Sequence, residues 1–591
     1  MGSANQPVSS MPGFNVPLNK LPKKNVFNPY NEGFPLALLP EEIGIDMNAI
    51  TQREIVMMQF MNTIMEKPEW DRKIFDTEIT AKWRNEIAQS GQDVSPKMIE
   101  WILKELEWKA KVLKETGIVS AFDPGIFRSD TAVPEEVQQA LKDAVKPLED
   151  VPEDRKDYHP GSDNQVIDLV HPSLFPVVYG KTRVLADSII GLDDCLHHVG
   201  QGELIPIPSK KDLGHANSGP LDPHSYSAWE KLYSGKFQWL PCEVQLLDGG
   251  DCRIVSYINN AHPVQHKALY KVIENVISQA LPLWEKSLSE LPNLRIAYRK
   301  VEYAEHPEPE PEESSDNEDF DQAEFDDAYT KWLENQPIIL PEPGVFVPPE
   351  EAGDLNMQRH FPDTNLQVIV KLANIELTPE KPNYNGGSWH IEGQLNERIC
   401  ATALYYYDNE NINENTLDFR KRATIDEEIS YEQSRHEFLQ AVFGFGDDVS
   451  GFGGDNTTQY IGGVLCKEGR LLTFPNTIQH RVSSFSLADP SKPGHRKILA
   501  LFLVDPHHRV ISSANVPPQS EEWGQEKQGL VDQVLSRLPA ELQRMVEEGL
   551  DPLMTMEEAK MLRLELMGER GLSSANANKE FEQGDFSLCE H

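Results

Sequence analysis

The sequence has few cysteines and no long apolar run. Its 591 residues include only six cysteines, and no two of them form a Cys-x-x-Cys pair. A disulfide framework or a cysteine-based zinc site is therefore not expected, and a reducing compartment is the better prediction. No uninterrupted stretch of about 18 apolar residues occurs, so we predict no transmembrane helix. The opening residues, MGSANQPVSS, lack the apolar segment of a secretory signal.

Basic residues are also scarce. Lys and Arg number 55 against 95 Asp and Glu, which gives a net charge of −40. Proteins that bind nucleic acids or anionic lipids need a basic face, so we expect neither a nucleic acid nor a membrane as partner. The expected location is cytoplasmic, with the nucleus left open. The pairs Lys23-Lys24 and Lys210-Lys211 are too short for a nuclear signal.

Changes in composition divide the chain into six regions. They are an extended N-terminal arm, a helical region, a mixed α/β region, an acidic disordered insertion, a β-rich core, and C-terminal helices with a tail. Their predicted bounds, in that order, are 1–45, 46–160, 161–301, 302–335, 336–515 and 516–591. The length suits about three to five domain-sized units. The expected fold class is α+β.

Start signals predict the first helices. Thr51-x-x-Glu54 is a capping box, and Ser95-Pro96 places an N-cap before a helix-starting proline. Met and Trp residues recur here at helical spacing, which favours a buried core over a binding surface. Further on, the pattern predicts a β-hairpin around Asp248-Gly249-Gly250, a helix over about 265–288 and a strand at Leu294–Val301.

The stretch 302–334 is strongly acidic. It holds fourteen acidic residues and one basic residue, Lys331, and prolines alternate with glutamates in its first part. This composition predicts a solvated insertion rather than a folded element. Ser315-x-x-Glu318 would suit an acid-directed kinase, but a charged loop without that role is the simpler interpretation.

Residues 365–511 have the texture of a β domain. Short apolar segments alternate with turn residues, which predicts a sandwich or barrel. The predicted strands are Leu366–Leu377, Ser388–Glu392, Ile399–Tyr407, Tyr460–Leu465, Arg470–Phe474, His480–Phe485 and Ile498–Val504. A helix near Ser430–Val442 interrupts them. The glycine-rich stretch 444–454 lacks the Lys-Ser/Thr of a phosphate loop, so we expect a loop at the barrel mouth instead. Helices are expected again over about 525–567.

One set of residues in the β region has the chemistry of a metal site. His390-Ile391-Glu392 is an H-x-E motif on a predicted strand, where residues i and i+2 point to the same face. The two side chains can therefore share one metal ion. The motif alone is a weak signal, since His306-Pro307-Glu308 matches it in the acidic insertion. The signal is stronger because His480 follows a Phe-Pro turn and Arg496 precedes the last apolar strand.

This order of residues resembles the Fe(II)/2-oxoglutarate-dependent dioxygenases. The resemblance implies a double-stranded β-helix core, a jelly roll of the cupin kind, over about 365–511. It also implies that His390, Glu392 and His480 ligate Fe(II), and that Arg496 binds the cosubstrate 2-oxoglutarate. At the position of Glu392 that superfamily more often has Asp.

The chemistry of these residue types agrees with that implication. Two imidazoles and one carboxylate leave three positions open on iron, enough for a chelating 2-oxo acid and molecular oxygen. The planar, permanently charged guanidinium of an arginine suits the far carboxylate of 2-oxoglutarate. Tyr384 and Thr402 are further candidate hydrogen-bond partners of the cosubstrate.

The chain as a whole resembles an uncharacterised family of large fungal proteins, itself a domain of unknown function. The resemblance is carried by SDNQVIDLVHPSLFPVVYGKTRV at 162–184, by SYINNAHP at 256–263 and by the core described above. We therefore expect an intracellular oxygenase that acts on a C–H bond of a small molecule or a protein side chain.

Two alternatives stay open. One is a jelly roll without bound metal, or with a different metal. The other is a non-catalytic jelly-roll interaction protein that recruits a basic partner through its acidic segment. The oligomeric state is left open as well.

Other histidines are weaker candidates. Cys195, His197 and His198 lie together in GLDDCLHHVG, but no second ligand pair follows at metal-site spacing, so a loop cluster is favoured. His262 and His266 are expected to serve a helix cap or turn. The pair at 507–508 is expected to lie in a turn after the last strand.

Overall fold

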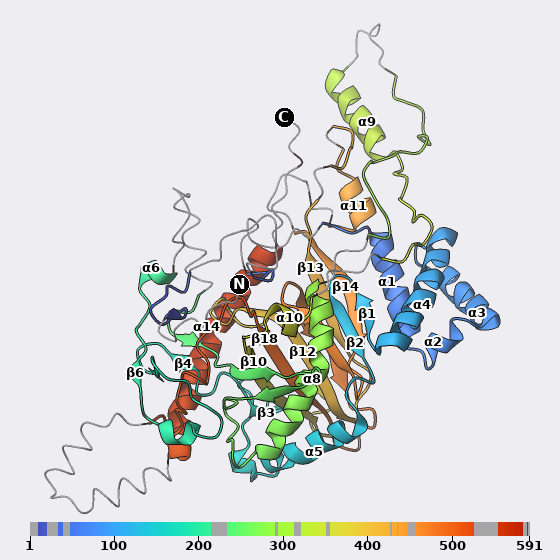
Figure 1. The fold of residues 1–591 in the computed structure, drawn as a ribbon. Coiled ribbons are helices and arrows are strands. Elements are labelled where there is room, and N and C mark those ends of the chain that lie inside the picture. The colour runs from blue at the N-terminus through green and yellow to red at the C-terminus, as the bar shows by residue number, and fades with distance from the viewer. Residues whose placement is uncertain are drawn as a thin grey trace, which may run out of the picture.

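The computed structural model (Figure 1) describes most of the chain. The described residues are 10–19, 33–38, 48–213, 233–289, 294–312, 321–349, 355–425, 428–433, 435–446, 449, 456–524, 553–582 and 588. The fold is a mixed α+β fold with antiparallel sheets, and in the described part of the chain no sheet closes into a barrel. No described helix is both long enough and apolar enough to cross a membrane.

A nine-stranded antiparallel sheet forms the centre of the molecule. Its order is β1-β2-β15-β12-β18-β10-β8-β9, and β3 also pairs with β10. The bounds are β1 Val119–Phe122, β2 Ile126–Ser129, β3 Val166–Val170, β8 Cys242–Leu246, β9 Cys252–Ile254, β10 Leu366–Leu377, β12 Ile399–Glu410, β15 Leu471–Pro475 and β18 Gly494–Val504. Its middle strands are almost wholly buried, which explains their continuous apolar sequences.

The two faces of this large sheet pack against different partners. On β12, Tyr405 and Tyr407 join the core beneath helix α8 (Lys267–Ser289), which crosses the sheet in Figure 1. Leu404 and Tyr406, which alternate with them, join the core on the opposite face. The sheet is therefore a middle layer between helices and a second group of strands.

The second group is a three-stranded sheet in the order β14-β13-β16. Phe419 of β13 meets Phe474 of β15 edge to face, with ring centroids 5.1 Å apart, so this small sheet packs on the inner face of the large one. Three two-stranded pairs complete the β structure: β11–β17, β4–β7 and β5–β6. The bounds are β4 Val177–Val178, β5 Arg183–Val184, β6 Glu203–Leu204, β7 Phe237–Gln238, β11 Asn383–Tyr384, β13 Thr416–Arg422, β14 Thr458–Leu465, β16 Gln479–Val482 and β17 Phe485–Ser486.

The predicted helix starts are confirmed. The Thr51 hydroxyl accepts the Glu54 amide N–H, and Ser95 accepts that of Met98, ahead of α1 and α4. The Met and Trp residues of these helices are core, as expected. The remaining bounds are α1 Gln52–Met65, α2 Trp70–Lys73, α3 Thr77–Ala88, α4 Pro96–Thr116, α5 Glu135–Glu149, α6 Lys210–Leu213, α9 Gln322–Glu334, α10 Met357–His360, α11 Phe438–Phe443, α14 Met556–Glu582, and the 3-10 turns η3 Glu153–Arg155 and η4 Cys195–His198.

Helix α14 lies along the outside of the molecule and is held mainly by ion pairs (Figure 1). Among its side chains Ala559, Leu566 and Phe581 are the buried apolar ones. Its charged residues pair with residues that lie far apart in the chain. These pairs are Lys181–Glu558, Lys560–Asp157, Arg563–Asp157, Lys236–Glu565, Arg570–Glu397 and Arg420–Glu582.

The structure departs from the sequence predictions in several places. The predicted strand at Leu294–Val301 is reduced to a single bridge at Lys300, and the one at Ser388–Glu392 to a bridge at His390. The acidic stretch contains α9, because Asp321 caps its first turn and Lys331 pairs with Asp327 one turn earlier. Strands β1, β2 and β13 were not predicted. Residues 313–320, 525–552 and most of the glycine-rich stretch lie outside the described residues.

Candidate metal centre

His390, Glu392 and His480 come together on one side of the small sheet. The backbones of His390 and His480 are joined by two N–H···O=C bonds of 3.1 and 3.0 Å, which bring the rings to 4.3 Å between centroids. Oε1 of Glu392 lies 3.3 Å from Nε2 of His480 and 3.7 Å from Nε2 of His390. The three ligand atoms all lie within 4.8 Å of one another. This spacing lets one metal ion contact all three.

The hydrogen bond of the His390 ring leaves a nitrogen free to bind a metal ion. Nδ1 of His390 lies 2.8 Å from the Ser388 carbonyl oxygen, and only a protonated nitrogen can donate to a carbonyl. The lone pair of His390 is therefore on Nε2, which faces Glu392. Nδ1 of His480 is buried and has no hydrogen-bond partner among the described residues, so its ring has no competing acceptor role.

The charges of the three groups are coupled. Burial alone would raise the pKa of Glu392, but the two adjacent imidazoles hold it well below the usual range. Burial lowers the pKa of His480, and the neighbouring His390 lowers it further. Burial also opposes the charge on His390, yet the Glu392 carboxylate raises the pKa of that ring. The site thus combines an ionised carboxylate with two imidazoles, the donor set of a divalent transition-metal ion.

Asn476 holds the carboxylate ligand in place, and the sequence analysis missed it. Its side-chain amide donates to the carbonyl oxygens of Glu392 and Ile399 and accepts the Glu392 amide N–H at 2.9 Å. The ring of Phe474, two residues before Asn476 in the chain, lies 4.7 Å from that of His480. An asparagine directly after a Phe-Pro turn was the available signal.

Arg496 is a buried cation without an acidic partner. It is the third residue of β18, is only 1 % exposed, and donates through Nη1 to the Asn415 side-chain oxygen at 2.6 Å. Its guanidinium lies over the rings of Tyr406 and Phe485. No carboxylate of the described residues pairs with it, and Nε has no partner there. Since an unpaired buried charge is costly, this position suits an anionic ligand.

The two other predicted cosubstrate residues lie at different places in the same interior. The Tyr384 ring meets Phe485 at 5.2 Å; burial raises the pKa of Tyr384, and the charge of Arg496 opposes that rise. Tyr384 therefore lies beside Arg496. Thr402 is fully buried on β12, next to Phe474 across the sheet, and its hydroxyl has no partner among the described residues. It thus lies nearer the ring that touches His480.

Two protein-family models match the chain. A family model described as a protein of unknown function (DUF4246) matches residues 96–527, and the model for the N-terminal DUF4246 domain matches residues 11–86. The chain belongs to the DUF4246 family. The expectation of a family of unknown function is thereby confirmed. No curated protein matches the chain.

The longer DUF4246 match includes all six residues predicted for the site, and it ends before α14. It also includes a second group of two histidines and one carboxylate. His159, Asp168 and His171 have ligand atoms within 4.8 Å of one another. Nδ1 of His159 lies 2.8 Å from Oδ2 of Asp168, and Nε2 of His171 lies 4.0 Å from the same oxygen. The sequence analysis did not single out this group.

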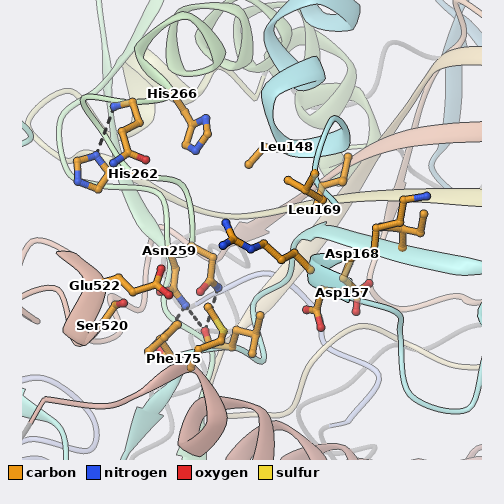
Figure 2. A pocket seen from close by; sticks show the side chains of 18 of the residues that line it. Leu148, Asp157, Asp168, Leu169, Phe175, Asn259, His262, His266, Ser520 and Glu522 are labelled. Carbon is orange, nitrogen blue, oxygen red and sulfur yellow. Dashed lines mark hydrogen bonds between the residues drawn. The ribbon is translucent and has the colours of Figure 1, made fainter. Parts of the chain in front are cut away.

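A cavity of about 950 Å³ adjoins this second group (Figure 2). Figure 2 shows His262 and His266 on one side of it and Asp157 and Asp168 on the other. It lies on the outer face of the large sheet, and none of the six predicted site residues lines it. Nδ1 of His262 accepts the amide N–H groups of residues 264 and 265, which confirms the expected turn role.

The remaining candidates from the sequence have ordinary structural roles. His198 pairs with Asp194, and among the described residues the Cys195 cluster forms no metal-binding group. His306 stacks on Trp332 with ring centroids 4.2 Å apart. The histidines at 507 and 508 both pair with Asp505 in the expected turn.

Proposed function

We propose that this DUF4246 protein is an Fe(II)- and 2-oxoglutarate-dependent oxygenase that oxidises a C–H bond of a small molecule or a protein side chain. One observation carries the proposal. Two imidazole nitrogens and a carboxylate oxygen converge on one point, and a buried, acid-free Arg496 lies in the same interior. A metal site needs the first feature, and an anionic cosubstrate needs the second.

We also propose that the core is a double-stranded β-helix. Support comes from the way in which the chain passes repeatedly between the two sheets. β10, β12, β15 and β18 belong to the large sheet, whereas β13, β14 and β16 belong to the small one. The segment around His390 adds to the small sheet through its bridge to His480. In a double-stranded β-helix the proposed metal ligands would lie between the two sheets.

The donor set fits Fe(II). Two neutral imidazoles and a carboxylate, with the remaining positions open, are characteristic of non-haem iron oxygenases. Bound Fe(II) would supply the redox chemistry with oxygen and 2-oxoglutarate. His390, Glu392 and His480 would hold the ion, and Asn476 would keep the Glu392 backbone in position.

The other residues of the interior would bind and orient the cosubstrate. The Arg496 guanidinium would pair with the far carboxylate of 2-oxoglutarate. The Tyr384 phenol, beside Arg496, would donate a hydrogen bond to the same group, and Thr402 would bind nearer the metal. The rings of Phe474 and Phe485 restrict water around these polar groups.

The test is an anaerobic titration of the purified protein with Fe(II) and 2-oxoglutarate. We expect a weak visible charge-transfer band in the wild type. In Arg496→Ala the 2-oxoglutarate concentration at half-saturation should rise at least about tenfold, because one charged hydrogen-bonded contact is lost. Arg253→Ala, on the exposed face of β9, is the control and should behave as wild type. A folded wild type that gives no band would contradict the proposal.

A second candidate function is a non-catalytic protein that binds a basic partner through its acidic stretch. Helix α9 favours it, because Phe325, Tyr329 and Trp332 stack in a row along a helix rich in exposed acidic residues. The two candidates differ in one outcome. Only the oxygenase requires that His390→Ala abolish metal binding while the fold survives.

A further inference from the structure

The C-terminal helix α14 contacts the residues that directly precede the two histidines of the candidate metal centre. Nδ2 of Asn578 donates to the main-chain oxygen of Trp389 at 3.0 Å. Oδ1 of the same side chain accepts from Nε2 of Gln479 at 2.7 Å. Trp389 directly precedes His390, and Gln479 directly precedes His480. One side chain thus bridges the two segments that carry the histidine ligands.

The direction of these hydrogen bonds is fixed by their neighbours. Nε of Arg420 can only donate, and it donates to Oε1 of Gln479 at 2.7 Å. The NH₂ group of Gln479 must then face Asn578, which in turn must offer its own NH₂ group to the Trp389 carbonyl. The order Arg420, Gln479, Asn578, Trp389 is therefore a chain in which each donor meets an acceptor.

Charged and aromatic contacts hold both ends of this chain. Arg420 pairs with Glu582 on the last turn of α14 at 2.9 Å. The guanidinium groups of Arg420 and Arg481 lie 4.9 and 4.4 Å from the centre of the Trp389 ring. Trp389 is thus held through its ring as well as through its main-chain carbonyl.

A second contact of α14 involves Glu397, which follows His390 and Glu392 in the chain. Arg570 pairs with Glu397 at 2.6 Å, and its guanidinium lies 3.9 Å from the Trp239 ring centre. The helix therefore contacts residues on both sides of His390 and Glu392 in the chain. This part of α14 lies alongside the metal-bearing segment.

The geometry relates the outer bridge to the metal. Gln479 and His480 are neighbours on β16, and neighbouring residues of a strand point to opposite faces. A metal ion would tie the two segments together on the inner face, and Asn578 ties them on the outer face. We propose that Asn578 is a positioning residue of the metal centre, so that α14 is a working part of the site. This inference rests on the metal site proposed above.

The test uses the full-length protein and Co(II), whose visible ligand-field bands report both binding and coordination geometry. Residues that orient metal ligands typically contribute about 10- to 100-fold to metal affinity. Because Asn578 acts through the residues next to the ligands, we expect Asn578→Ala to weaken Co(II) binding about tenfold and to change the band shape. Asn576→Ala is the matched control, since Asn576 is exposed on the same helix two residues earlier.

The outcomes separate this inference from the function on which it rests. Wild-type affinity and spectrum in Asn578→Ala would overturn the inference and leave the metal site standing. An equal loss in Asn576→Ala would also overturn it, because the effect would then belong to the helix in general. A wild type that binds no Co(II) would overturn both proposals. Should Asn578→Ala fail to fold, Asn578→Asp decides on the same two measurements, because it keeps the acceptor and loses the donor.

Discussion

Two groups of histidine and carboxylate side chains in this protein have the same composition and almost the same spacing. One is His390, Glu392 and His480; the other, at 159, 168 and 171, lies by the outer cavity. They differ in the hydrogen bond that Nδ1 makes in His390 and in His171. The Nδ1 atom of His390 donates to a carbonyl, which leaves the lone pair on Nε2 for a metal.

In the second group, the hydrogen bonds of His171 indicate the opposite tautomer. Nδ1 of His171 accepts the Ser173 amide N–H at 3.2 Å, so the proton is on Nε2, which faces Asp168 as a donor. Arg563 already brings a positive charge to 3.5 Å from the same carboxylate. This group is therefore a hydrogen-bond and ion-pair network rather than a ligand set. Residue type and distance alone do not distinguish the two; the tautomer and the local charge do.

The largest expected difference between the groups is in metal content. His390→Ala should remove the bound ion entirely, because two protein ligands do not hold Fe(II) in competition with water. His171→Ala should leave one ion per chain. Anaerobic dialysis against Fe(II), followed by elemental analysis, measures both variants. Loss of the ion in the folded His171→Ala protein would remove the distinction drawn here.

The second prediction concerns stability. Arg563→Ala leaves Asp157 and Asp168 without their buried cation and should lower the free energy of unfolding by about 3–5 kcal/mol. Lys560→Ala is the matched control, because Lys560 is a half-exposed partner of the same Asp157 and should cost less than about 1 kcal/mol. Urea unfolding measures both. Equal losses of unfolding free energy in the two variants would show that burial of the cation does not set the strength of these ion pairs.

The smallest expected effect is a dependence on pH. Burial lowers the pKa of His171 well below its usual value of about 6.5, although Asp168 opposes the shift. Below about pH 6.5 the unfolded chain therefore takes up a proton that the folded protein does not, and stability falls as the pH falls. The slope from this residue is at most about 1.4 kcal/mol per pH unit.

His171→Asn should reduce that slope, because it removes the imidazole that titrates. Asparagine is chosen because its side-chain oxygen can still accept the Ser173 amide N–H. Unfolding in urea at several pH values between 5 and 7 measures it. His360→Asn, on the exposed helix α10, is the control. An unchanged slope in His171→Asn would assign the pH dependence to other groups.

The middle strands of the large sheet, β10, β12 and β18, were predictable because burial on both faces demands an unbroken apolar sequence. β10 has the predicted bounds, and β12 and β18 differ from theirs only at the ends. β13 was missed for the opposite reason. Only Leu417 and Phe419 point into the core, while Asp418 and Arg420 face outward to polar partners. A strand with two apolar residues has little signal in sequence.

The site shows the same limit. The three proposed metal ligands could be singled out in the sequence because H-x-E is a local pattern and His480 follows a recognisable turn. Asn476 and Asn578 act through contacts with residues 84 and 189 positions away in the chain. No local pattern marks such contacts, because they exist only once the sheets and α14 have packed.

The position of Asn578 has a consequence for the order of events during synthesis. During synthesis, His390, Glu392 and His480 leave the ribosomal exit tunnel before α14 does. A nascent chain can therefore hold every ligand residue while the outer bridge between Trp389 and Gln479 is still missing. An ion captured at that stage would be bound by the weaker, unbridged site. Firm retention of the metal would come only after α14 is made and docks, so completion of the helix would act as the last step of cofactor assembly.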